Sequence, residues 1–117
     1  RDDQLIYEIK KDIQLGDKAL DGAQLRPHIV WFEEPVPLIE AAIPIVQTAD
    51  VFVVIGTSLV VYPAAGLVNY TQSVIPKYII DKKVPPTSFV HNVIAIEKTA
   101  TDGIQELMEL LQKLPTK

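Results

Sequence analysis

The sequence predicts an α/β protein that contains part of a doubly wound parallel sheet. The first observation is an unbroken apolar run at residues 51–55, which is rich in β-branched residues and ends at Gly56. A run without polar alternation is typical of a strand that is buried on both faces, inside a parallel sheet. Two further short apolar runs follow at residues 77–81 and 92–96, and helical patterns lie around the three runs. Such alternation of strands and helices is typical of βαβ units.

Composition excludes several classes of function. The chain has 117 residues, one domain's worth, and 48% of them are hydrophobic, which is enough for a core. The net charge of −4, without a basic run, argues against nucleic acid or an anionic membrane as partner. The absence of cysteine excludes disulfides, a cysteine zinc site and a thiol nucleophile. No signal peptide is visible and no apolar run approaches the roughly 20 residues of a membrane span, so we expect a cytoplasmic protein.

The amino end predicts a short β segment. Residues 5–9 are strand formers, whereas residues 12–21 are polar. We therefore expect one or two short strands and a loop over residues 1–24. Pro27 favours an extended chain before it, and the apolar residues 29–32 are predicted to be extended as well.

A crossover helix is predicted at residues 38–48, before the first strand. Its apolar residues recur at helical spacing: Leu38, Ile39, Ala42, Ile43 and Val46. Pro44 lies inside this pattern and should kink or split the helix. After the first strand, Pro63 fits the first position of a short helix that runs to residue 73.

The remaining elements follow the same alternation. In the second strand we expect Tyr78, Ile79 and Ile80 to be buried and Asp81 to end the strand. The third strand is predicted at residues 92–96. Thr99 or Thr101 can cap the last helix, which Pro115 ends. The apolar face of that helix comprises Ile104, Leu107, Met108, Leu110 and Leu111.

Polar side chains follow the first strand and end the second. Gly56 permits a sharp turn or the close approach of a ligand, and Thr57 and Ser58 offer hydroxyls that suit a ribose. In open α/β sheets, ligands bind at the carboxyl ends of strands. Asp81 follows Gly56 by 25 residues. This separation is similar to that in dinucleotide-binding folds, where a ribose-binding carboxylate follows the glycine turn by about 20 residues. Alternatively, the hydroxyls satisfy backbone groups in the turn and Asp81 is a turn former.

Two blocks of this sequence resemble the sirtuins, which are NAD-dependent protein lysine deacylases. Residues 56–65, GTSLVVYPAA, are similar to the family motif GTSLxVxPAA. Residues 25–34, LRPHIVWFEE, are similar to the motif LRPxIVWFGE. The blocks have the order and about the spacing of the family, and the resemblance covers only the later part of a sirtuin. It implies a Rossmann-like sheet, NAD as co-substrate, and acyl transfer from lysine to ADP-ribose with release of nicotinamide.

The resemblance also implies roles for particular residues. Gly56, Thr57, Ser58 and Asp81 would contact NAD, with Asp81 standing where most sirtuins have asparagine. A carboxylate there would favour NAD over NADP. The backbone of Lys98, Thr99 and Ala100 would cradle adenine. The acyl-lysine peptide would contact these residues: Val30, Phe32, Glu33, Glu34, Leu59, Val60 and Val61. Glu33 replaces a glycine of the family, which puts peptide binding in question.

The resemblance further divides the chain and suggests what it lacks. Residues 1–24 correspond to the small-domain region, here without zinc cysteines, so we expect no metal. Residues 25–117 correspond to the later half of the NAD-binding domain. Neither His28 nor His91 stands in the family's catalytic position, and no phosphate-binding glycine loop is present. We therefore expect the isolated chain to be inactive, and to self-associate or pair with the preceding half of the fold. The alternatives are a non-enzymatic nucleotide- or ADP-ribose-binding module and an interaction or structural domain.

Overall fold

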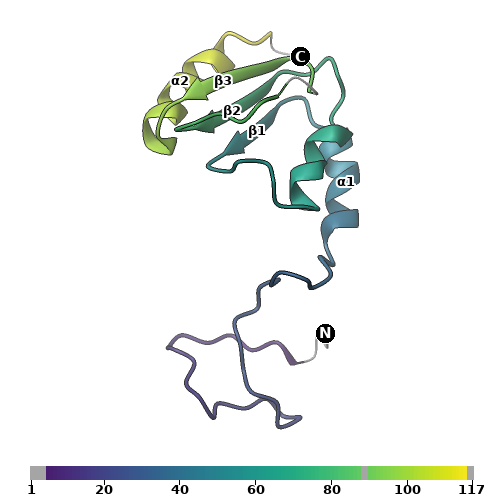
Figure 1. The fold of residues 1–117 in the computed structure, drawn as a ribbon, viewed down its shortest axis with the longest axis vertical. Coiled ribbons are helices and arrows are strands. Elements are labelled where there is room, and N and C mark those ends of the chain that lie inside the picture. Colours follow the sequence, from purple (N-terminus) through teal and green to yellow (C-terminus); the bar gives the residue numbers. More distant parts are fainter. Residues whose placement is uncertain (1–4, 88–89, 116–117) are drawn as a thin grey trace. The chain divides into compact units, whose positions relative to one another are not determined.

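A three-stranded parallel sheet forms the centre of the larger part of the chain (Figure 1). The computed structural model describes residues 5–87 and 90–115 and divides into two units, Arg1–Pro35 and Val36–Lys117, called here the amino-terminal and carboxyl-terminal units. The elements in chain order are α1 (Ile39–Gln47), β1 (Phe52–Ile55), η2 (Ala64–Tyr70), β2 (Lys77–Asp81), β3 (Val93–Glu97) and α2 (Ala100–Gln112). The strands lie in the order β1-β2-β3, which confirms the predicted α/β class with a parallel sheet.

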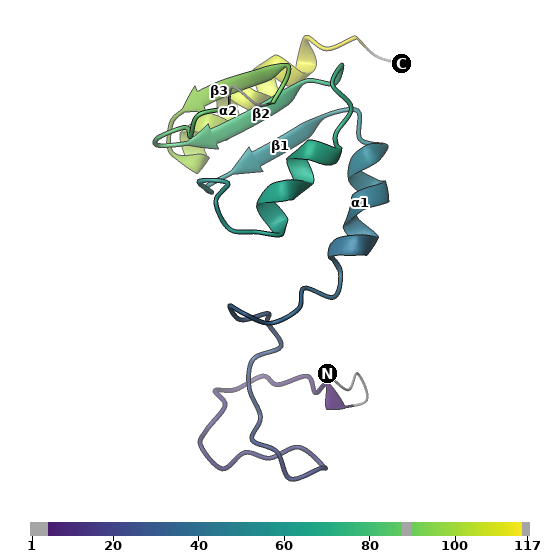
Figure 2. The ribbon, with the colours of Figure 1, turned by 45° about the vertical axis from the view of Figure 1, so that its right-hand side comes forward.

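The central strand β2 holds more buried residues than any other helix or strand in the described part of the chain. Tyr78, Ile79 and Ile80 are buried, as predicted, because β2 pairs with a strand on each side. Tyr78 and Ile80 form the core cluster with Ile96 of β3 and Leu107 of α2. Figure 2 shows α2 behind the sheet and η2 in front of it, so helices lie on both faces. This is the doubly wound arrangement that the sequence predicts.

The prediction that the first strand is buried on both faces is wrong for β1. Val54 is buried, but Val53 is 36% and Ile55 is 46% exposed. In the parallel register Val53 lies beside Tyr78 and Ile55 beside Ile80, on the face that α2 covers. Because α2 packs over β2 and β3, it leaves these two side chains of β1 open. Within the described residues, the outer edge of β1 has no neighbouring strand.

This open edge leads us to expect self-association. Unpaired strand edges beside apolar side chains pair with other chains. Sedimentation velocity at low micromolar concentration should therefore show dimers or larger species. A Val53→Lys variant should shift the distribution toward monomer, whereas Val74→Lys, at an exposed site outside the sheet, should not. A monodisperse monomer for the unaltered chain would contradict this expectation.

The helices differ from the predicted ones in detail. The predicted crossover helix is shorter by one residue at each end, and Pro44 lies inside it without splitting it. The helix predicted after Pro63, up to residue 73, is a seven-residue 3₁₀ helix that begins at Ala64, ends three residues early at Tyr70 and packs against α1. Thr99 caps α2 by accepting a hydrogen bond from the Asp102 backbone N–H at 3.3 Å. Leu107 is buried as predicted, but Met108 is exposed and does not belong to the apolar face.

Lys77 is a charged residue that the sequence did not single out, yet it is only 2% exposed. Its Nζ donates hydrogen bonds to the backbone oxygens of Gln72 (2.8 Å) and Ile75 (3.1 Å), which ties the loop before β2 to the strand. Burial lowers the pKa of the Lys77 ammonium below its usual value of 10.5. Charge burial is tolerated here because carbonyl oxygens replace water.

The lowered pKa of Lys77 predicts a pH dependence of stability. Between the folded-state pKa and the ordinary value of 10.5, the unfolded chain binds more protons, so the free energy of unfolding rises with pH. Below the folded-state pKa the cost of burying the charge is constant. Urea titrations from pH 8 to pH 10 should show this rise in the unaltered chain but not in Lys77→Met. Parallel pH profiles for the two proteins would contradict the assignment.

The amino-terminal unit holds its shape through turns and side-chain hydrogen bonds. Residues 6–9 are not a strand, and the described residues of this unit contain one antiparallel bridge, between Lys18 and Gln24. The Gln24 amide accepts from the Gly16 N–H at 2.7 Å and donates to the Gln14 oxygen at 3.0 Å. Side-chain bonds of this kind occupy backbone groups that strand pairing would otherwise use. The predicted amino-terminal strands are thus reduced to a single bridge.

Residues 29–32 are also not the extended run that the sequence predicts. The Ile29 N–H donates to the Pro27 oxygen at 2.9 Å, and the Glu34 N–H donates to the Trp31 oxygen at 3.2 Å. These local bonds turn the chain at both ends of the run. Apolar character alone therefore misled the prediction, because the turns are set by Pro27 and by the residues that follow Phe32.

Candidate functional site

The carboxyl ends of the three strands bring most of the predicted NAD-binding residues to one edge of the sheet. Because β1, β2 and β3 are parallel, Gly56, Asp81 and Lys98 follow or end their strands at the same edge. The Gly56 N–H continues the ladder by donating to the Ile80 oxygen at 2.9 Å. Asp81 lies beside Glu97 in the register of β2 and β3. This edge is where open α/β sheets bind their ligands.

Gly56 turns the chain away from β1 and leaves space beside it. Its φ of +66° is in the left-handed region, and a Cβ there would meet no heavy atom within 4 Å. A side chain would therefore be strained by the backbone angle and would fill space that a ligand can use. Thr57 and Ser58 follow on the exposed turn. The Thr57 hydroxyl accepts from the Leu59 N–H at 3.3 Å, which supports the turn and leaves its proton to donate.

Asp81 takes part in a turn as well as ending β2. Its Oδ1 accepts a hydrogen bond from the Lys83 N–H at 3.2 Å, so the turn-forming alternative is realised in the structure. A carboxylate has further lone pairs on both oxygens, and the residue is only partly buried. Glu97 was missed by the sequence reasoning, although it ends β3 as Asp81 ends β2. Its Oε1 accepts from the Val84 N–H at 3.4 Å.

In the segment expected to cradle adenine, residues 98–100, the polar side chains already have partners within the chain. Lys98 Nζ pairs with Glu106 Oε2 at 2.7 Å, and the hydrogen bond and charge of Glu106 raise the pKa of Lys98. Thr99 caps α2, and Ala100 begins it. These contacts leave the backbone of this segment, rather than its side chains, for a ligand.

Most of the residues predicted to meet the peptide are exposed, except that Glu34 and Leu59 are half-buried, and they lie in both units. In the amino-terminal unit, Val30 is 38% and Phe32 is 84% exposed. In the carboxyl-terminal unit, Val60 and Val61 are exposed and Leu59 has a positive φ of 55°. A leucine in this region is strained, and such strain is found at ligand-binding positions.

Glu33, which replaces a glycine of the motif, adopts the backbone angle that glycine favours. Its φ is 67°. A side chain at Cβ therefore does not forbid this conformation but strains it, at a cost of about 1 kcal/mol. Glu34, the next residue, has an ordinary φ and pairs with Arg26.

Glu33→Gly should therefore raise the free energy of unfolding of the amino-terminal unit by about 1 kcal/mol. Urea titration followed by Trp31 fluorescence measures this, because Trp31 is the only tryptophan. The variant also removes a side chain from the predicted peptide surface and should tighten acetyl-lysine peptide binding, measured by calorimetry. Glu8→Gly, in the same unit at an ordinary φ, is the control and should give no gain. Equal results for the two variants would contradict the strain at Glu33.

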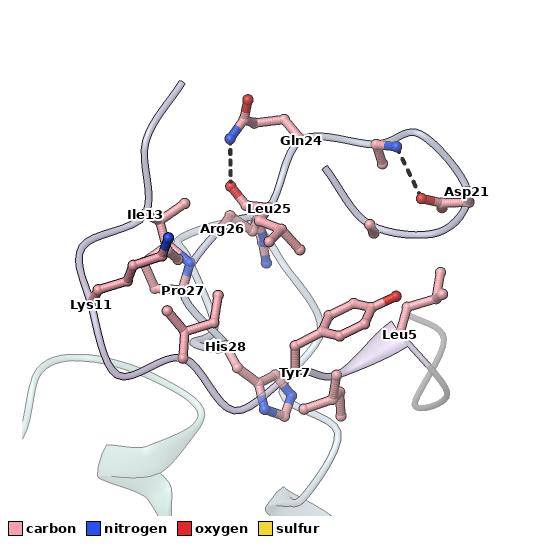
Figure 3. Close-up of a pocket in the computed structure, with 14 residues that line it drawn as sticks. Leu5, Tyr7, Lys11, Ile13, Asp21, Gln24, Leu25, Arg26, Pro27 and His28 are labelled. Atoms are coloured by element: carbon pink, nitrogen blue, oxygen red, sulfur yellow. Dashed lines mark hydrogen bonds between the residues drawn. The ribbon is translucent and has the colours of Figure 1, made fainter. Parts of the chain in front are cut away.

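A cavity of about 440 Å³ lies within the amino-terminal unit, where the sequence predicted no site (Figure 3). Apolar side chains, among them Leu5 and Ile13, line it together with His28. The Tyr7 hydroxyl, also at the cavity, accepts from the Leu20 N–H at 3.2 Å. None of the predicted site residues lines this cavity, so it does not belong to the site at the strand ends.

Two classes of feature were not found in the part of the chain that the structure describes. No cluster of three or more histidine, cysteine, aspartate or glutamate residues there could hold a metal ion. No described helix is both long enough and apolar enough to cross a membrane.

The fold is that of an α/β protein with a Rossmann-like parallel sheet, and comparison with known proteins identifies the family. Residues 3–63 match the model of the Sir2 family. The chain is 50% identical over 109 residues to an NAD-dependent protein deacylase of Bacteroides thetaiotaomicron, covering 93% of this chain and 45% of that protein. It is 44% identical over 111 residues to an NAD-dependent protein deacylase of Helicobacter pylori, covering 95% and 48%. The chain belongs to the Sir2 family and spans about half the length of these relatives.

Solved structures agree with this assignment. A Sir2 homologue in complex with 2′-O-acetyl ADP-ribose has a TM-score of 0.64 and 33% identity, over 79% of this chain and 38% of that one. A Sir2 protein bound to a propionylated peptide has a TM-score of 0.63 and 29% identity, over 78% and 39%. The resemblance inferred from the two sequence blocks is thereby confirmed.

Proposed function

We propose that this chain supplies the later part of an NAD-dependent protein lysine deacylase. The observation that carries the proposal is the meeting of Gly56, Thr57, Ser58 and Asp81 at the carboxyl edge of a parallel sheet. The open space at Gly56 and the exposed hydroxyls beside it suit a sugar and its diol. NAD, when bound, supplies an activated nicotinamide ribose to which the acyl group is transferred as nicotinamide leaves.

Each group of residues has a distinct task in this proposal. Ser58 and Asp81 orient the ribose by hydrogen bonds, and Asp81 repels a 2′-phosphate, which favours NAD over NADP. The backbone of residues 98–100 lies against adenine. Val30 and Phe32 contact the acyl-lysine side chain, and the backbone beyond Phe32 pairs with the peptide as an added strand. On the carboxyl-terminal unit, Leu59, Val60 and Val61 offer apolar surface to an acyl-peptide.

A second candidate is a non-enzymatic module that binds ADP-ribose. It is favoured by one feature: Gly56, Thr57, Ser58, Asp81 and residues 98–100 all belong to the carboxyl-terminal unit. Nucleotide binding therefore requires nothing from the loop that carries Val30 and Phe32. Turnover of an acyl-peptide distinguishes the two candidates once the chain is joined to the part of a relative that it does not match, because the module would bind ADP-ribose but give no turnover there.

Titration of the 117-residue chain with ADP-ribose by calorimetry tests the shared step. Ser58→Ala and Asp81→Ala should each weaken binding about fivefold, which corresponds to about 1 kcal/mol for one hydrogen bond. Ser73→Ala, on an exposed loop before β2, is the matched control and should bind normally. Asp81→Asn should retain binding, because an amide also bonds a ribose hydroxyl. Equal affinity in Ser58→Ala, Asp81→Ala and the control would contradict the ribose site.

A further inference from the structure

A two-pronged ion pair closes the loop that carries the predicted acyl-lysine contacts. Arg26 Nη1 lies 2.7 Å from Glu34 Oε1, and Arg26 Nη2 lies 2.9 Å from Glu34 Oε2. Each terminal guanidinium nitrogen thus meets a different carboxylate oxygen, which is the geometry that fixes direction as well as distance. The pair joins positions eight residues apart and encloses residues 27–33.

The same two side chains also bond the backbone inside the loop. Arg26 Nη2 donates to the Ile29 oxygen at 3.3 Å. Glu34 Oε2 accepts from the Trp31 N–H at 3.0 Å, and the Glu34 N–H returns a bond to the Trp31 oxygen at 3.2 Å. The hydrogen bond and charge of Glu34 raise the pKa of Arg26, so the guanidinium stays charged. The pair therefore ties down the middle of the loop as well as its ends.

With its backbone bonded inward, the loop presents apolar side chains outward. Ile29, Val30, Trp31 and Phe32 are all between 38% and 84% exposed. Four consecutive exposed apolar residues are unusual on a soluble surface and mark a contact site. A loop that contains no strand or helix needs other interactions to hold such a surface in one conformation. If the loop became ordered only on binding, the lost conformational entropy would lower its affinity for the peptide.

We propose that Arg26 and Glu34 are positioning residues that hold the loop of residues 27–33 in the shape that receives an acyl-lysine peptide. This inference rests on the proposed function for the identity of the peptide, but the closure of the loop does not. Neither charged side chain needs to touch the peptide. Their effect passes through the backbone at Ile29 and Trp31, on either side of Val30.

Trp31 allows the loop to be observed directly, because it is the only tryptophan and its backbone N–H donates to the Glu34 carboxylate. Acrylamide quenching of Trp31 fluorescence measures how well the loop shields the indole. Fluorescence anisotropy of a fluorescein-labelled acetyl-lysine peptide, titrated with the 117-residue chain, measures the affinity of the chain for the peptide. Arg26→Gln should raise the quenching constant and weaken peptide binding about fivefold, a size typical of the loss of one coupled side-chain contact.

Three further variants separate positioning from general damage. Arg26→Lys keeps the charge but loses the fork, so it should fall between the unaltered chain and Arg26→Gln. The exchanged pair, Arg26→Glu with Glu34→Arg, should recover part of both signals. Lys10→Gln removes a charge of the same unit that pairs with Glu8 at a longer 3.8 Å, and it should change neither signal. High salt should weaken peptide binding by the unaltered chain, so that its affinity approaches that of Arg26→Gln.

The outcomes distinguish the two claims. Unchanged quenching and peptide affinity in Arg26→Gln would overturn the positioning role while leaving the proposed peptide site in place. A changed quenching constant with unchanged affinity would likewise overturn it, because the loop's shape would then not matter to the peptide. An unaltered chain that binds no acetyl-lysine peptide would overturn the proposed peptide site and the positioning role together.

Discussion

Replacing Gly103 by alanine should lower the free energy of unfolding of the carboxyl-terminal unit by about 2 kcal/mol, the usual cost of overpacking a core. A Cβ at Gly103 would overlap the Cγ2 atom of Ile80, which is fully buried at the centre of β2. Its distance of 3.5 Å from Cγ2 of Ile96 would be an ordinary contact, so the overlap is with Ile80. Either α2 or the buried Ile80 side chain must shift to relieve this overlap. Alanine's better helix propensity, worth about 1 kcal/mol, offsets only part of the loss.

Urea titration followed by far-ultraviolet circular dichroism measures the effect. Gly66→Ala is the matched control, because a Cβ there would meet only the Tyr62 ring, at an ordinary 3.6 Å. Ile80→Ala removes the obstructing Cγ2 but also lowers stability by itself. The double variant with Gly103→Ala should therefore lose less free energy of unfolding than the sum of the two single losses. Additive changes, or a Gly103→Ala result no larger than that of Gly66→Ala, would refute the close packing of α2 on β2.

The isolated 117-residue chain should release no nicotinamide from NAD in the presence of an acetyl-lysine peptide. By resemblance to the sirtuins, the catalytic histidine and the phosphate-binding glycine loop belong to the preceding part of the fold. The two histidines of this chain, His28 and His91, are exposed, and by resemblance neither stands in the family's catalytic position. Chromatographic detection of nicotinamide after incubation with purified protein decides the matter. Release above the blank that disappears in Ser58→Ala would show that the chain is complete enough to react.

Sequence patterns correctly predicted those features that are determined by residues close together in the chain. Strand β2 was predicted with its bounds, because its apolar run is flanked on both sides by polar or proline residues. The Thr99 cap followed from a hydroxyl placed just before an amphipathic run. The strand-end position of Gly56, Ser58 and Asp81 followed from the parallel topology, because such strands share one carboxyl edge.

What the sequence could not predict depends on contacts between distant residues. The exposure of Val53 and Ile55 is set by where α2 packs, which their own apolar character does not reveal. The loop of residues 27–33 is shaped by Arg26 and Glu34, and a charge pair eight residues apart has no periodic signal. Gly103 sits in an otherwise ordinary helical pattern, and only the position of Ile80 explains it.

The central claim is that this chain forms the ribose and acyl-peptide walls of a deacylase, and one chimera tests it most directly. The part of the Bacteroides thetaiotaomicron deacylase that this chain does not match would be joined to the chain and assayed for NAD-dependent deacylation of an acetyl-lysine peptide. We expect the chimera to release nicotinamide, and Ser58→Ala, but not Ser73→Ala, to reduce that release at least tenfold, or about 1.4 kcal/mol in barrier height. A folded chimera that releases no nicotinamide, or whose activity is indifferent to Ser58→Ala, would contradict the account.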